Sequence, residues 1–213
     1  MARVSVSLAV SQLEEVAGRA RPVALAEERL LPVLASLEPL LPQGLRRGTV
    51  VTVSGATGST SLALALAAAA SRAGSWCAAV VTEPPPLGLQ AAAQLGIVLE
   101  RFPVVVVPSS AVRGFAWVLA TLIEAFDVVL AWPLAPLRPA DARRLVARGR
   151  ERGSTLVVAG SHWPESADLR LEVGGTAWQG IGRGHGRLER RQLEVRAVGR
   201  GAASRERSVR VCL

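Results

Sequence analysis

The chain has 213 residues, of which 50% are hydrophobic and 20% are charged, and its mean hydropathy is positive. Such a composition can bury a core of ordinary size, and it excludes disordered and fibrous proteins. The apolar runs are much shorter than the roughly 20 residues that cross a membrane, so no transmembrane helix and no membrane partner are expected. The first residues do not fit a signal peptide, and we therefore expect a cytoplasmic protein.

The net charge is +8, and all 25 basic residues are arginines. One excess of arginine lies between residues 183 and 213, and another lies on a helix that Pro139 is expected to open. These arginines are a candidate surface for nucleic-acid phosphates or for an acidic protein, and a merely solvated basic face explains them equally well. The candidate surface consists of Arg144, Arg148, Arg152, Arg205, Arg207 and Arg210.

The cysteines and histidines predict neither a disulfide scaffold nor a metal site. Cys77 and Cys212 are two isolated thiols without metal-ligand spacing. His162 and His185 have no cysteine or carboxylate ligand set beside them in the sequence. We expect no bound metal.

Residues 1–45 mix leucine and valine with glutamate and arginine in a pattern that predicts an N-terminal helical segment, which ends at a turn over 42–44. Residues 46–213 form the predicted core domain, in which strand-like and helix-like stretches alternate. The predicted strands are 49–54, 77–82, 104–107, 127–132 and 155–159, and the predicted helices are 60–72, 87–95, 115–126 and 139–152. Near-continuous apolar strands are typical of a parallel sheet with helices on both faces, an α/β architecture.

The last part of the chain has a different pattern. Residues 169–173, 193–198 and 208–212 alternate apolar and polar side chains without helices between them, which predicts antiparallel strands at one edge of the sheet. The glycine-rich stretch 174–186 is predicted to be a hairpin connection. We also expect Trp76, Trp117 and Trp132 to lie in the core, while the two tryptophans of predicted loops, Trp163 and Trp178, are candidate interface anchors.

Residues 51–62 form a hydrophobic strand, a Gly/Ser/Thr loop and an Ala/Leu helix, which is the layout of a phosphate-binding P-loop. A working P-loop has a lysine for the phosphates and a hydroxyl for Mg²⁺ after its second glycine. If Gly58 is that glycine, Ser59 stands at the lysine position and Thr60 at the hydroxyl position. The degenerate loop thus comprises Gly55, Gly58, Ser59, Thr60 and Ser61.

The loss of the lysine removes a charge that stabilises the transition state of phosphoryl transfer, and no residue nearby in the sequence replaces it. The free backbone N–H groups at the start of the helix leave weak nucleotide binding open. The alternative interpretation is that residues 51–62 form a strand, a turn and a helix with a structural role alone. No cofactor is expected.

The segment 41–55 resembles the entry to the RecA recombinase core, and the order of the following elements resembles that core as well. The run 79–83 resembles the strand with the catalytic glutamate and places Glu83 at that position. The run 126–132 resembles the Walker B strand, but Trp132 stands where its aspartate belongs. The run 154–162 resembles the strand that ends in the γ-phosphate sensor, with His162 in place of glutamine.

This resemblance implies a RecA-like core that has lost its catalytic chemistry at three positions. It also implies shortened DNA-binding loops, since only residues 163–166 separate His162 from the next strand, and the loop after the Walker B position is cut to about 133–138. Both features argue against a RecA-type filament on single-stranded DNA.

A RecA-like core of this size with a degenerate P-loop is similar to the ImuA-type accessory proteins of the bacterial SOS response, in particular the actinobacterial ImuA-prime group. That similarity implies a protein with no enzymatic role that works, near the nucleoid, in mutagenic translesion DNA synthesis. Its implied partners are ImuB, a catalytically inactive relative of Y-family polymerases, and an error-prone C-family polymerase.

Two alternatives stay open at this stage. One is a divergent RecA-type ATPase or recombinase that uses Ser59, Thr60 and an arginine of a neighbouring subunit, with Glu83 as its metal ligand. The other is a RecA-like domain with a different binding role. Direct contact with DNA through the arginines is compatible with each of them, and the sequence leaves the oligomeric state open.

Overall fold

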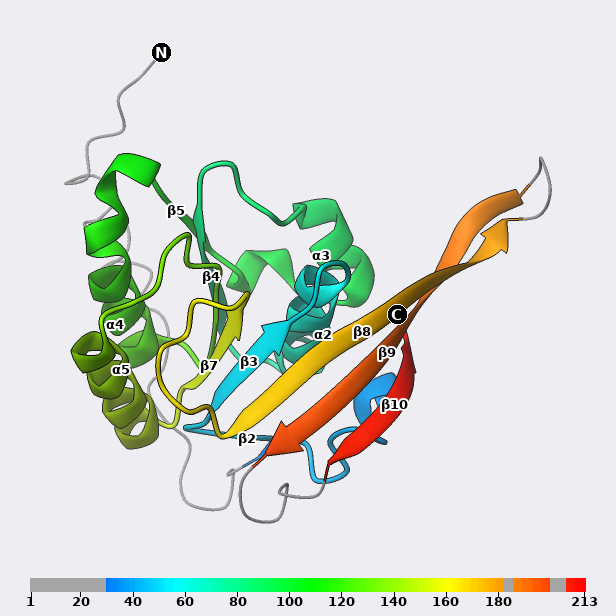
Figure 1. Ribbon diagram of the computed structural model, residues 1–213, viewed down its shortest axis with the longest axis horizontal. Helices are drawn as coiled ribbons and strands as arrows, with labels where there is room; N and C mark the ends of the chain where they lie inside the picture. The colour runs from blue at the N-terminus through cyan, green and yellow to red at the C-terminus, as the bar shows by residue number, and fades with distance from the viewer. Residues whose placement is uncertain (1–29, 182–185, 200–205) are drawn as a thin grey trace.

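The computed structural model describes residues 30–181, 186–199 and 206–213. Its main sheet contains eight strands: β3 (Val50–Ser54), β4 (Cys77–Thr82), β5 (Val104–Val107), β6 (Val128–Ala131), β7 (Thr155–Ala159), β8 (Leu169–Ile181), β9 (Gly186–Gly199) and β10 (Arg207–Cys212). Their order across the sheet is β10-β9-β8-β3-β7-β6-β4-β5 (Figure 1). The strands from β8 to β5 pair in parallel, and β9 is antiparallel to both β8 and β10.

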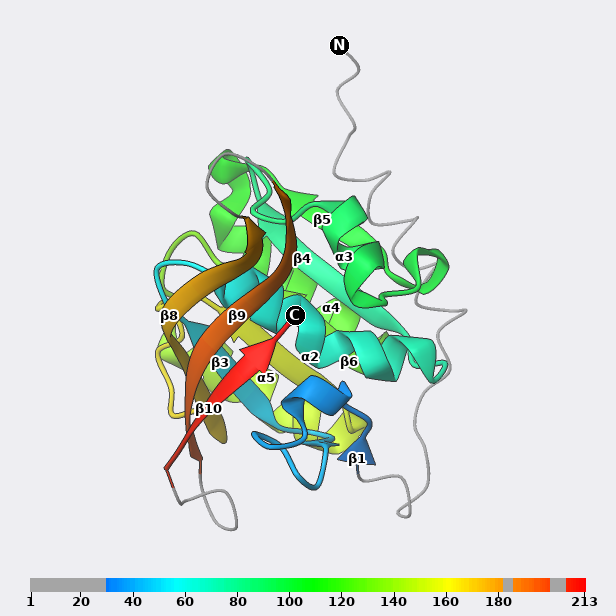
Figure 2. The same cartoon turned by 90° about the vertical axis from the view of Figure 1, so that its right-hand side faces the viewer.

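Helices cover both faces of this sheet, as its apolar strands require. The helices are α2 (Ser59–Arg72), α3 (Leu89–Leu95), α4 (Phe115–Ala125) and α5 (Pro139–Arg152), with short 3-10 turns at η2 (Leu99–Arg101) and η3 (Ser109–Gly114). Figure 2 shows α2 and α3 side by side on one face. Side chains of α2 belong to one buried cluster, and those of α4 and α5 belong to a second cluster across the sheet.

The predicted mixed α/β architecture is confirmed, and so are the strands and helices from residue 49 to 159 to within a few residues. In β4, β6 and β7 every residue is buried, because each strand has helices on both sides. The helix α2 buries most of its alanines and leucines, and the small alanines bring it close to the sheet. None of the described helices combines the length and the apolar character that crossing a membrane demands.

The predicted helical segment is wrong for residues 30–45. Here β1 (Leu30–Leu31) pairs antiparallel with β2 (Leu45–Arg46), and only a 3-10 turn, η1 (Ala35–Leu37), lies between them. Prolines at 32, 39 and 42 prevent a continuous helix. The buried Leu31, Leu37 and Leu45 pack into the same cluster as α2, so this segment completes the core. Residues 1–29, the rest of the predicted segment, lie outside the described residues.

The predicted hairpin at 174–186 is confirmed, but its connection is shorter than predicted, because β8 continues to Ile181 and its antiparallel partner β9 begins at Gly186. Two register shifts, at Val173/Gly175 and Gln179/Ile181, accommodate the glycines within the paired strands. The two strands extend past the body of the protein as a two-stranded ribbon (Figure 1). We call residues 174–181 of β8 and 186–192 of β9 the arm.

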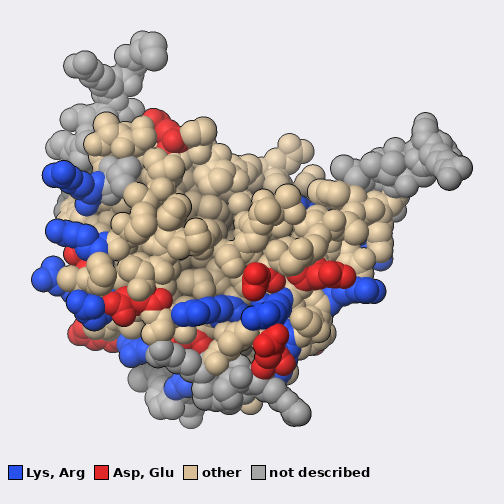
Figure 3. Space-filling model, viewed as in Figure 1, with Lys and Arg blue, Asp and Glu red and all other residues tan. Residues whose placement is uncertain are grey.

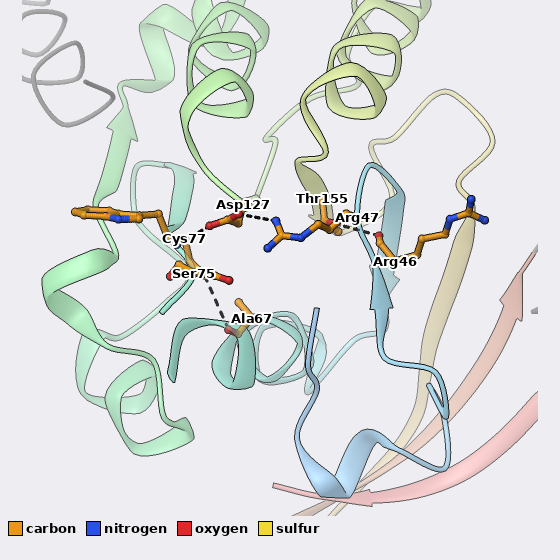
Figure 4. Close-up of polar contacts among 8 residues, drawn as sticks. Arg46, Arg47, Ala67, Ser75, Cys77, Asp127 and Thr155 are labelled. Carbon is orange, nitrogen blue, oxygen red and sulfur yellow. Dashed lines mark hydrogen bonds and ion pairs between the residues drawn. The ribbon is translucent and has the colours of Figure 1, made fainter. Parts of the chain in front are cut away.

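Asp127 ties together the starts of several strands, at the edge opposite the P-loop-like segment (Figure 4). Its carboxylate forms an ion pair with Arg47 and accepts a hydrogen bond from the backbone N–H of Trp76 at 2.8 Å. Its backbone carbonyl accepts a hydrogen bond from the N–H of Thr155 at 2.8 Å. One residue before β6 thereby holds the chain leading into β3 and β4 and the first residue of β7.

Cys77 lies beside this cluster, with its thiol 3.9 Å from the carbonyl oxygens of Ala67 and Ser75 (Figure 4). Burial, together with the negative charge of Asp127, raises the pKa of the Cys77 thiol to about 12. Because only the thiolate is an effective nucleophile, Cys77 is an inert core residue, as its position in a buried strand predicts.

We predict that Asp127→Ala lowers the free energy of unfolding by about 2–4 kcal/mol, because it leaves the Arg47 guanidinium and the Trp76 N–H without their partner. A suitable control is Glu194→Ala, which removes an exposed ion pair with Arg210 and is expected to cost less than about 1 kcal/mol. Urea unfolding followed by circular dichroism measures both. Equal effects of the two substitutions would contradict the structural role of Asp127.

Candidate functional site

The P-loop-like segment runs from the end of β3 into α2, at the edge of the sheet where the parallel strands end. Gly58 caps the helix with a left-handed backbone (φ 89°), and Gly55, Ala56 and Thr57 are exposed. In open α/β sheets, ligands bind at this carboxyl edge. Glu83, Trp132 and His162 follow β4, β6 and β7, so the fold brings the residues singled out in the sequence to one edge of the sheet.

The Trp132 side chain contacts the degenerate loop directly. The indole is only 8% exposed, and its Nε1–H donates a hydrogen bond to the Thr60 hydroxyl at 3.3 Å. Thr60 stands where a P-loop hydroxyl would bind Mg²⁺. An indole N–H is a donor without an acceptor lone pair, so Trp132 offers no ligand to a cation. Trp132 therefore fills the space beside Thr60 and uses one acceptor lone pair of its hydroxyl.

Glu83 and His162 do not join this contact. Glu83 is exposed, and no hydrogen bond or ion pair connects it to the degenerate loop among the described residues. The Nδ1 atom of His162 lies 3.1 Å from the Pro133 carbonyl oxygen, where a protonated nitrogen donates a hydrogen bond. His162 thus connects the ends of β6 and β7. Within the described residues, no group of three or more His, Cys, Asp or Glu side chains could hold a metal ion.

The C-terminal strands pack against the same loop, which the sequence did not indicate. The hydroxyls of Thr57 and Thr176 lie 3.1 Å apart, and Nη1 of Arg191 donates to the Ser61 hydroxyl at 2.9 Å. A Cβ atom at Gly58 would lie 2.7 Å from Cδ2 of the buried Leu193. Thr176, Arg191 and Leu193 are more than 110 residues away from the loop, so no local pattern could identify them.

Arg191 brings a positive charge to the first turn of α2, although no charge is present near Ser59 in the sequence. The guanidinium also lies over the indole of Trp178, with its carbon 5.1 Å from the ring centroid. Ser61 and Trp178 together hold the arginine beside the loop. The guanidinium therefore comes from β9, which lies on the other side of β3 from β6 and Trp132 in the strand order.

The candidate arginine surface divides into separate groups. Arg144, Arg148 and Arg152 lie on α5, whereas Arg207 and Arg210 lie on β10 at the far edge of the sheet. Arg205 lies outside the described residues. Carboxylates lie close to several of these guanidinium groups: Asp141 at 3.9 Å from Arg144, Glu124 at 3.1 Å from Arg148 and Glu194 at 3.4 Å from Arg210.

Other arginines of α5 are paired as well, Arg143 with Glu165 at 2.8 Å and Arg150 with Asp168 at 3.3 Å. Figure 3 shows acidic and basic side chains interleaved on the visible face. The positive net charge thus produces no continuous basic strip on this face.

The tryptophans differ from expectation at two positions. Trp132 is buried and Trp76 packs partly buried against the core, as predicted. Trp117, predicted to lie in the core, is 52% exposed, because it occupies the outward side of α4. Trp178, predicted in a loop, lies in β8 with 51% of its surface exposed. Trp163 packs partly buried against the second core cluster.

The fold defines an α/β protein with a strand, a glycine-containing loop and a helix at the carboxyl edge of a mainly parallel sheet. Residues 39–165 match the family model described as the MT3502 N-terminal domain. Over 171 residues the chain is 34% identical to the uncharacterized protein Rv3395c of Mycobacterium tuberculosis, an alignment that covers 77% of this chain and 80% of that protein. The chain belongs to the MT3502 family.

The matched region contains β3 to β7 with their helices and ends before β8 begins at Leu169. The degenerate loop, Glu83, Trp132 and His162 all lie within it. The arm, with Thr176, Trp178 and Arg191, lies beyond it.

We predict that Gly58→Ala destabilises the protein by about 2–4 kcal/mol, since the new methyl group meets Leu193 and the backbone keeps a positive φ. Gly74→Ala is the matched control. Gly74 also has a positive φ, of 102°, but nothing lies within 4 Å of an added Cβ, so only about 1 kcal/mol is expected. Thermal unfolding of both variants separates backbone strain from the contact with β9, and equal losses would argue against that contact.

Proposed function

We propose that this chain is a non-catalytic, RecA-like accessory protein of damage-induced, error-prone translesion DNA synthesis. The observation that carries the non-catalytic part is the hydrogen bond from the Trp132 indole to Thr60. In a P-loop ATPase, the hydroxyl and the Walker B carboxylate cooperate to hold Mg²⁺. Here the carboxylate position is an indole, and that indole engages the hydroxyl itself.

The three substitutions act on different parts of phosphoryl transfer, so their effects combine. Ser59 removes the charge that stabilises the phosphates, Trp132 removes the metal-ordering carboxylate, and His162 turns toward the Pro133 carbonyl. A single substitution could be compensated by a neighbouring group. Loss of all three supports a protein that retains the scaffold without the reaction.

Protein partners are the second part of the proposal: an ImuB-like Y-family relative and an error-prone C-family polymerase. These partners follow from the resemblance to ImuA-type proteins. Exposed apolar side chains support docking of other proteins, because Trp117 and Leu134 are each more than half exposed. The paired arginines of α5 favour a protein contact over a phosphate backbone on that side, since their charge is already balanced locally.

One observation favours the alternative, a divergent ATP- and DNA-binding protein with residual ATPase activity. Arg191 places a guanidinium at the first turn of α2, where it could contact a phosphate. It is already hydrogen-bonded to Ser61, and within the described residues no hydrogen bond or ion pair links a carboxylate, Glu83 included, to the degenerate loop. A direct measurement decides between the two functions.

We predict that the purified chain neither binds nor hydrolyses Mg²⁺-ATP, with or without single-stranded DNA. Ser59→Lys alone is not expected to restore turnover, because the lysine would act without a metal carboxylate. Calorimetric titration and phosphate release measure the two steps. Saturable binding with DNA-stimulated turnover in the unmodified chain would establish the alternative function.

We further predict that deleting the gene in its host bacterium lowers damage-induced mutation frequency to near the uninduced level. A Thr60→Val copy is expected to restore that frequency fully, because the hydroxyl has no catalytic task. The valine costs about 1–3 kcal/mol by leaving the Trp132 N–H unpaired, so protein levels are measured alongside. Unchanged mutation frequency after deletion would disprove the role in translesion synthesis, and failure of Thr60→Val at normal protein level would disprove its non-catalytic character.

A further inference from the structure

The arm has more positive than negative side chains. Its residues, 174–181 and 186–192, include three arginines and one glutamate. Among the described residues, Arg190 and Arg191 form no ion pair, whereas Arg143, Arg148 and Arg150 of α5 and Arg210 of β10 lie beside carboxylates. The arm is part of the two-stranded ribbon that extends from the body (Figure 1).

An exposed aromatic side chain lies among these arginines. Trp178 of β8 is directly opposite Arg191 of β9 in the strand register, and the neighbouring pair is Gln179 and Arg190. The guanidinium of Arg191 stacks on the indole, yet 51% of Trp178 is still exposed. The uncovered part of the ring is available to a ligand that stacks on it, beside the guanidinium.

We infer that the arm binds single-stranded nucleic acid, with a base stacked on Trp178 and the phosphate backbone near Arg191, which lies on the same face of the ribbon. Unpaired bases present flat π faces that stack on an aromatic ring, and arginines neutralise the adjacent phosphates. An acidic protein could also bury the indole, and the competition experiment below distinguishes it from a nucleic acid. This inference does not require the proposed function, which depends on protein partners and the degenerate loop.

The full-length chain is titrated into a fluorescent oligothymidylate of about 30 nucleotides, and anisotropy is recorded at two salt concentrations. We expect binding that weakens steeply as salt rises. Trp178→Ala is expected to weaken it roughly 5- to 100-fold, the range that corresponds to the loss of one stacked base. Trp117→Ala is the matched control, because Trp117 is equally exposed but lies on α4, and it is expected to change affinity less than about 2-fold.

A second pair of variants tests the charge. Arg191→Ala and Arg190→Ala change the net charge equally, but Arg190 lies on the face of the ribbon opposite Trp178. We expect Arg191→Ala to weaken binding more and to reduce the salt dependence by about one phosphate contact. Equal effects would indicate a general attraction to the positive chain and overturn the assignment.

Two further outcomes would overturn the inference: no binding of oligothymidylate at low salt, or equal losses for Trp178→Ala and Trp117→Ala. Polyglutamate of similar length is the competitor that distinguishes an acidic protein surface. If it displaces the oligonucleotide at equal charge concentration, the arm recognises acidic chains instead. Trp178→Phe keeps an aromatic face and is expected to retain most of the affinity, which separates stacking from misfolding of the alanine variant.

Discussion

The hydrogen bond between Trp132 and Thr60 connects the end of β6 to the first turn of α2 at the carboxyl edge of the sheet. An indole is large, rigid and almost wholly buried here, so it both fills the space beside α2 and uses the hydroxyl at its first turn. The degenerate loop therefore has a different physical environment from that of a P-loop with a metal. The backbone geometry at Gly58 is retained, while the polar groups around it make contacts within the protein.

The long β8–β9 hairpin contributes the second constraint on this edge. Its base lies against the loop through Thr176, Arg191 and Leu193, so β3, α2 and the C-terminal strands are packed as one unit. The hairpin continues past the body beyond these contacts (Figure 1). Because Arg191 contacts both Ser61 and Trp178, a ligand stacked on Trp178 lies near the start of α2.

At the opposite edge, Asp127 performs a purely structural task. It joins the chain before β3 and β4 to the beginning of β7 through one ion pair and several hydrogen bonds. These contacts fix the starts of the strands independently of the residues at the carboxyl edge. Ion pairs also stabilise the body of the protein, where several arginines lie beside carboxylates.

The sequence by itself determined the α/β architecture and most elements between residues 49 and 159, because buried parallel strands and capped helices leave strong local patterns. It also located the degenerate loop, whose residues are contiguous. It failed at residues 30–45 and made the hairpin connection at 174–186 too long, because strand pairing decided the outcome in both segments. Only the tertiary structure placed Trp132 on Thr60, Arg191 on Ser61 and Trp117 outside the core. These contacts join residues far apart in the chain or depend on which side of a helix faces outward, and both are consequences of packing rather than of local sequence.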